Sequence, residues 1–266
     1  MKEEKNQVVV EEKDKGIFKR ATDLITGVPT PSYIIYIIAS TPIGFALGLK
    51  IGISYIMPVI NAILIYPVYL AYILKGRLKT AVVMVLVWSM MLSAVVILYS
   101  YQDPERTGSM IVMGERYKNE MFEWLKTGRG VEGDISRFLP QHLLHLSTFS
   151  ILCLATGGFG GLIMGSVLLN YMNYYVGSLW QASQNAKVIL YGWSIWSVIR
   201  VVGYIIISIF LSTPLINRIE KKSWKFKKYS LYLYLGLLLI LLDIILKYTL
   251  SPVWRSLILK YILKGW

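Results

Sequence analysis

Charge is scarce in this chain. Asp, Glu, Lys and Arg together make up 16% of its 266 residues, whereas a soluble domain carries about a quarter. Apolar runs close to the length of a membrane-spanning helix take the place of the missing charge. The composition therefore argues against an ordinary soluble domain and predicts an all-α, polytopic transmembrane helix bundle.

Cysteine and the common catalytic motifs are scarce too. Cys153 is the only cysteine, so no internal disulfide can form. The sequence has no Walker motif, no Rossmann fingerprint, no zinc-finger spacing and no Ser-His-Asp arrangement. The loops between the apolar runs are too short to hold a soluble catalytic domain. These absences make an enzyme the less favoured class of function, and they predict no cofactor.

The apolar runs predict about seven spans. They cover residues 33–49, 52–74, 80–100, 139–155, 162–180, 188–211 and 229–250. We expect Pro214 to end the sixth span, because proline breaks a helix interior. The turns near Lys50 and Gly158 are tight, so a neighbouring segment is either a full crossing or a re-entrant dip.

The chain divides into a charged tail, one membrane domain and a terminal helix. Residues 1–28 form a charged tail with a short amphipathic helix, and we expect no cleaved signal peptide. Residues 29–250 form the transmembrane domain, whose long loop at 101–138 carries an amphipathic helix with Met121 and Trp124 on its apolar face. Residues 251–266 are expected to form an interfacial helix.

The formal net charge of +13 comes largely from short basic loops, chiefly at 75–79 and 217–228. Such loops stay on the cytoplasmic side and lie against anionic headgroups. We therefore expect the lipid bilayer, and no nucleic acid, as the partner of the basic residues. Seven spans then place the N-terminus in the cytoplasm, and the C-terminus and the long loop outside, in a cell membrane.

Four charged residues fall within or beside apolar runs: Lys50, Arg200, Asp243 and Lys247. The two lysines lie near span ends, where we expect their side chains to snorkel to water. Arg200 and Asp243 each lie about 20 Å from the cytoplasmic end of their span. Charges at that depth are costly and mark functional sites. We predict an intramembrane ion pair between them, which either links two helices or forms a gate or coupling site.

The only two histidines, His142 and His145, lie at the outer end of the fourth span. Their three-residue spacing puts both side chains on one helical face, which suits a shared metal ion. Carboxylates of the long loop are available as further ligands: Glu115, Glu120, Glu132 and Asp134. The other interpretation is that both histidines bind headgroups or loop carbonyls. A single metal ion is thus an alternative and not an assigned cofactor.

Small and polar residues recur within the spans. Two glycine ladders repeat every four residues and allow helices to pack closely: Gly44, Gly48 and Gly52, then Gly157, Gly161 and Gly165. They predict either packing within the chain or contact with a second copy or a membrane partner. Polar side chains of the second and fifth spans are candidates to line a cavity: Asn61, Asn170, Asn173 and Tyr174.

Three functions remain open. The default is a membrane scaffold or assembly component, which requires neither a cavity nor a convergent polar site. A transporter or permease component requires a polar cavity that joins the three asparagines to Arg200. A metal-dependent membrane enzyme requires His142 and His145 to converge with a loop carboxylate. The sequence names no substrate or ligand, and it leaves the oligomeric state open.

Overall fold

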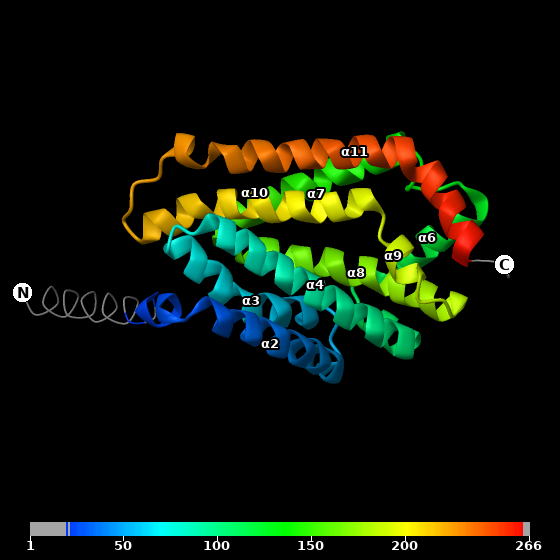
Figure 1. Ribbon diagram of the computed structural model, residues 1–266, viewed down its shortest axis with the longest axis horizontal. Coiled ribbons are helices and arrows are strands. Elements are labelled where there is room, and N and C mark those ends of the chain that lie inside the picture. Colours follow the sequence, from blue (N-terminus) through cyan, green and yellow to red (C-terminus); the bar gives the residue numbers. More distant parts are fainter. Residues whose placement is uncertain (1–19, 21, 263–266) are drawn as a thin grey trace, which may run out of the picture.

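The computed structural model describes residue 20 and residues 22–262. Every regular element in this part of the chain is a helix, and no strand occurs there. The long helices run side by side along the length of the molecule (Figure 1). They and the shorter helices are α2 (Thr30–Ile51), α3 (Ile56–Leu74), α4 (Leu78–Gln102), α5 (Pro104–Met110), α6 (Gly114–Thr127), α7 (Ile135–Thr156), α8 (Phe159–Ser183), α9 (Val188–Gly192), α10 (Ile195–Ile219) and α11 (Phe226–Ile262).

The expected N-terminal tail falls largely outside the described residues. Residues 1–19 and 21 are not described, and residues 22–27 form a helical stretch ahead of α2. This stretch overlaps the end of the predicted amphipathic helix. At the other terminus, residues 263–266 also lie outside the described part of the chain.

Six helices are long and apolar enough to cross a membrane: α2, α3, α4, α7, α10 and α11. The chain is therefore a multi-pass helical membrane protein. Helix α8 is a seventh long helix, but it is not one of the six. It carries Asn170, Asn173 and Gln181, and these polar side chains lower its hydropathy. A seventh crossing through α8 stays a prediction.

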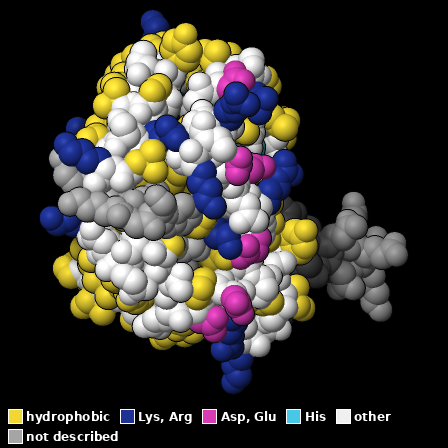
Figure 2. Space-filling view, turned by 90° about the vertical axis from the view of Figure 1, so that its right-hand side faces the viewer, with side chains coloured by type: hydrophobic (Ala, Val, Ile, Leu, Met, Phe, Trp, Pro, Cys, Tyr) yellow, Lys and Arg dark blue, Asp and Glu magenta, His cyan; other side chains and the backbone are white. Residues whose placement is uncertain are grey.

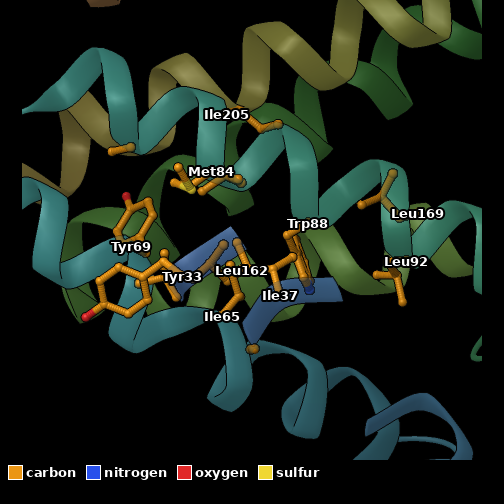
Figure 3. Packing of buried hydrophobic residues seen from close by; sticks show 14 of the residues in the cluster. Tyr33, Ile37, Ile65, Tyr69, Met84, Trp88, Leu92, Leu162, Leu169 and Ile205 are labelled. Atoms are coloured by element: carbon orange, nitrogen blue, oxygen red, sulfur yellow. The ribbon is translucent and has the colours of Figure 1, made fainter. Parts of the chain in front are cut away.

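Buried side chains fill the space between α2, α3, α4, α8 and α10. Trp88 of α4, Leu162 of α8 and Ile205 of α10 belong to this core cluster (Figure 3). Between helices in lipid, such packing stabilises through dispersion and interhelical hydrogen bonds. One such bond joins the hydroxyl groups of Tyr69 and Ser212, 2.6 Å apart. Helices α7 and α11 bury a much smaller share of their apolar residues than α3, α4 and α10.

Glycines end the helices at both predicted tight turns. Gly52 follows α2 with a φ of 76°, and Gly157 and Gly158 follow α7 with φ values of 61° and 95°. A side chain on Cβ disfavours this left-handed conformation, so glycine is the usual residue there. Each glycine ladder therefore contains a helix end, and α2 and α3 are separate helices, as are α7 and α8.

The predicted sixth span is wrong at both ends. Helix α10 begins at Ile195, because a short separate helix, α9, precedes it. It also runs through Pro214 and ends at Ile219. Proline is tolerated in a membrane helix where neighbouring helices and hydroxyl groups satisfy backbone groups. Pro214 leaves the carbonyl of Phe210 without its helical N–H donor. The hydroxyl groups beside the proline donate to other carbonyls of α10, Ser212 to Ser208 O at 2.6 Å and Thr213 to Ile209 O at 2.7 Å.

Helix α11 also continues through a proline, Pro252, and it bends toward its C-terminal end (Figure 1). The residues predicted as a separate terminal helix extend α11 as far as Ile262. Beyond the bend, Arg255 donates to carbonyl oxygens at the end of α6, with Nε 2.9 Å from Leu125 O and Nη2 2.9 Å from Lys126 O. The last part of α11 is therefore attached to α6.

The long loop of the prediction contains α5 and α6. Helix α6 buries Met121, Trp124 and Leu125 and ends at Thr127, and the next residue, Gly128, has a φ of 71°. It contacts α8. Figure 2 looks onto this end of the bundle, where Lys and Arg side chains alternate with Asp and Glu across the face and hydrophobic side chains lie around them.

Candidate functional site

Arg200 of α10 and Asp243 of α11 form a bidentate ion pair. The guanidinium Nε lies 2.9 Å from Asp243 Oδ2, and Nη2 lies 2.9 Å from Oδ1. Asp243 is 0% exposed. Bidentate geometry is the arrangement that best offsets the desolvation of two such charges. Close backbone contact accompanies the pair, because a Cβ on Gly203 would lie only 3.2 Å from Gly236 O.

The pair lies nearer one end of the bundle than the sequence predicted. The predicted depth assumed that the sixth span ends at residue 211. Helix α10 extends to Ile219 instead, so Arg200 lies in its second turn. The pair therefore lies toward the end of the bundle that carries α6, and not at the middle of α10.

A second buried ion pair lies one helical turn further along α11. Lys247 is 2% exposed, and its Nζ lies 2.9 Å from Glu132 Oε2. Trp196 donates from Nε1 to the other oxygen of Glu132 at 3.0 Å. The snorkelling prediction for Lys247 is wrong, because the loop before α7 supplies a buried carboxylate. Lys50, by contrast, is exposed at the end of α2.

The four charges compensate one another. Burial acts to raise the pKa of Glu132, whereas the nearby Lys247 and Arg200 act to lower it. The effect of the two cations is larger than the effect of burial, so the pKa of the Glu132 carboxyl lies below its ordinary value. Two cations, Arg200 and Lys247, then face two anions, Asp243 and Glu132. We call these four residues together with His142 the charge cluster.

His142 of α7 has an open ring nitrogen in this cluster. Its Nδ1 lies 2.9 Å from the carbonyl oxygen of Phe138, so Nδ1 carries the proton and donates. Its Nε2 is buried, has no hydrogen-bond partner in the described chain, and lies 3.5 Å from Asp243 Oδ2. In this tautomer Nε2 is an acceptor that faces another acceptor. A buried acceptor without a donor is uncommon in folded proteins.

Two cavities meet at the charge cluster. One of about 60 Å³ lies between α4, α7, α8 and α10 and has apolar walls. The other, of about 40 Å³, is lined by polar side chains of α6, the following loop and α11, among them Glu120, Glu132 and Lys247. Four side chains line both cavities: His142, His145, Tyr171 and Arg200. These four residues form the boundary between a polar and an apolar compartment.

The structure does not bring the predicted metal ligands together. Within the described part of the chain, no group of three or more His, Cys, Asp or Glu side chains is placed to hold a metal ion. His145 lines the cavities, but all four candidate loop carboxylates have other partners, since Glu132 is paired with Lys247 and Glu120 with Arg116. Glu115 accepts from Tyr174 and Lys118, and Asp134 accepts from a backbone N–H at the start of α7. The metal site stays a prediction without a third ligand.

None of the predicted cavity-lining asparagines lines a cavity with Arg200. Asn61 and Asn170 are buried between α3 and α8, where Asn61 donates to Ser166 at 3.2 Å. Asn173 lines another cavity, of about 200 Å³ between α4, α8 and α10, and donates to Ser93 at 2.8 Å. The asparagines mainly join helices, so the polar cavity that a transporter was expected to form between them and Arg200 is absent among the described residues, and any solute site lies in the cavities described above.

The glycine ladders pack largely within the chain. Gly44 and Gly48 face α3, where a Cβ on Gly48 would lie 2.8 Å from a side chain. Gly161 faces α7, where a Cβ would overlap Cys153 Sγ. Gly165 differs, because no heavy atom outside its own helix backbone lies within 4 Å of the Cβ position. It lines the apolar cavity.

Sequence reasoning missed the Glu132–Lys247 pair and did not select Tyr171 as a site residue. The four-residue spacing of Asp243 and Lys247 places both on one face of α11, and it was a signal that two buried partners were needed. Tyr171 is one of several polar residues in its span, and nothing in the sequence distinguishes it from Tyr174 or Tyr175.

Comparison of the chain with protein-family models, with curated proteins and with solved structures found no match.

Proposed function

We propose that this protein is a transporter or permease component that binds a small solute beside the charge cluster. One observation carries the proposal: a polar and an apolar cavity meet at His142, His145, Tyr171 and Arg200. Solute sites are concave and largely apolar, with a few polar groups that fix orientation. Ionisable side chains within a membrane domain mark such pathways.

The alternative function, a scaffold or assembly component, does not require these cavities and does not explain them. A purely structural link between α10 and α11 accounts for the Arg200–Asp243 pair, but not for the open Nε2 of His142. The glycines of the ladders face neighbouring helices or end helices, apart from Gly165. They therefore lend little support to an interface with a second copy or a membrane partner.

The proposed topology places α6 and the polar cavity on the outer side of a cell membrane. The basic loops at 75–79 and 217–228 lie at the end of the bundle opposite α6 (Figure 1), and basic loops favour the cytoplasmic side. Helix α8 then supplies the seventh crossing, and the N-terminus lies in the cytoplasm and the C-terminus outside. Solute enters the polar cavity from outside and reaches the apolar cavity past Arg200.

Solute flux in proteoliposomes tests the proposal. Vesicles with and without the protein are loaded with a mixture of organic anions, organic cations, amino acids, amides, alcohols and sugars. The solutes released over seconds are identified by mass spectrometry. We expect one class to leave the protein-containing vesicles faster than the protein-free vesicles. The proposal is wrong if no class does so and if none raises the unfolding midpoint of the purified protein.

A further inference from the structure

We infer that the solute is a small uncharged molecule with a hydroxyl or carboxamide head and an apolar body about the size of one ring. This inference rests on the proposed function and names the solute class for the same site.

The charge balance of the site favours an uncharged solute. Arg200 is paired with Asp243, and Lys247 is paired with Glu132. In the polar cavity, the further carboxylate of Glu120 is paired with Arg116 at 2.9 Å. A fifth charge in the cluster would have no counter-ion. Burying an uncompensated charge is far more costly than burying a hydrogen-bonded neutral group.

The head of the solute needs both an acceptor and a donor. Arg200 uses Nε and Nη2 for Asp243, and no described residue accepts a hydrogen bond from its Nη1. An oxygen of the solute can accept from Nη1. His142 Nε2 is the open acceptor, so it needs an O–H or N–H of the solute. A hydroxyl group or a primary carboxamide supplies both functions.

The cavities set the size and character of the body. A cavity accommodates one water-sized group in about 10–15 Å³. The apolar cavity of about 60 Å³ and the polar cavity of about 40 Å³ together therefore suit a solute of about seven to ten non-hydrogen atoms. Trp88, Phe149 and Tyr204 contribute aromatic walls to the apolar cavity, and the rings of Phe149 and Tyr204 meet edge to face at 4.7 Å. Such walls favour a flat ring.

Three nearly isosteric probes test the inference by equilibrium dialysis at neutral pH. Benzamide is neutral, benzoate is an anion and benzamidine is a cation, and each has one ring and one planar head. The detergent-purified full chain is compared with protein-free micelles as a blank. The matched variants are Gly165→Leu, which fills the apolar cavity, and Gly27→Leu, which adds the same side chain at an exposed position that lines neither cavity and has no neighbour within 4 Å.

We expect one benzamide per chain, bound at least tenfold more tightly than benzoate or benzamidine. Gly27→Leu should change this affinity by less than threefold, and Gly165→Leu should abolish binding. The inference is overturned if a charged probe binds as tightly as benzamide, or if Gly165→Leu binds benzamide like the wild type. If no probe binds but the vesicles release another solute class, the inference fails and the proposed function stands. If no probe binds and no flux occurs, both fail.

Discussion

The ammonium of Lys247 lies 2.9 Å from the carboxylate of Glu132, and this contact ties the loop before α7 to the apolar helix α11. One turn away, Asp243 ties the same helix to α10 through Arg200. Each charge has an opposite partner, so the cluster is compensated as it stands. Removal of one member is therefore expected to cost more than removal of a matched pair.

The Arg200–Asp243 pair gives the first prediction. Arg200→Met or Asp243→Leu alone should lower the free energy of unfolding by about 3–5 kcal/mol, because each leaves a buried unpaired charge. The double variant should recover most of this loss. Unfolding of the purified protein by SDS in mixed micelles measures the three variants. Equal damage in the single and double variants would show that the two residues are not coupled.

Glu132 gives a prediction of pH dependence. Because its pKa is lowered in the folded chain, its contribution to stability is fully present above the pKa of the unfolded chain. The contribution is lost as the pH falls through the lower folded pKa. The unfolding midpoint should stay level from about pH 7 to about pH 5 and fall below about pH 4.

The matched control for this pH dependence is the Glu132→Gln/Lys247→Met double variant, which lacks the ion pair but leaves no unpaired charge. Its unfolding midpoint should fall less steeply than that of the wild type over the same acidic range. Identical slopes would mean that Glu132 does not account for the acid sensitivity.

Gly161 reports on the contact between α7 and α8. Gly161→Ala should destabilise the protein by about 1–3 kcal/mol, because the new methyl group overlaps Cys153 Sγ. Gly165→Ala makes the same change in open space and should be neutral or stabilising by up to about 1 kcal/mol. Adding Cys153→Ala to Gly161→Ala should restore stability. Equal unfolding midpoints for the two glycine variants would contradict this packing.

Arg255 reports on the attachment of α6. The guanidinium group of Arg255 donates hydrogen bonds to the last carbonyl oxygens of α6. Its positive charge also faces the negative end of that helix dipole. Arg255→Leu removes interactions that contribute about 1.5–3 kcal/mol, so amide hydrogen exchange at the end of α6 should accelerate roughly tenfold or more. Arg255→Lys keeps the charge without the guanidinium group and should give an intermediate rate. Unchanged exchange in Arg255→Leu would contradict the attachment.

The helical class and the multi-pass character could be predicted because a bilayer demands apolar helices of a fixed length. The structure confirms both. The turns were predictable for a similar reason, since Gly52 and Gly157 adopt a backbone conformation that suits glycine. The ends of α10 were not predictable, because tolerance of Pro214 depends on hydroxyl groups and on neighbouring helices.

The site was only partly predictable. Arg200 and Asp243 stand out as charges within apolar runs, so the sequence marks them directly. Glu132 belongs to a polar loop with other carboxylates, and nothing local distinguishes a buried member from the exposed ones. Its burial depends on how the loop folds over Lys247. The open nitrogen of His142 depends in turn on the carbonyl of Phe138, which fixes the tautomer.

Flux and stability of Gly165→Leu together distinguish loss of the solute site from loss of the fold. Both quantities are measured in the same preparation, for the solute that the vesicle experiment identifies, with Gly27→Leu as control. We expect Gly165→Leu to unfold at or above the midpoint of the wild type while its flux falls to that of protein-free vesicles. Wild-type flux in a stably folded Gly165→Leu protein would show that the cavity beside Arg200 is not the solute site.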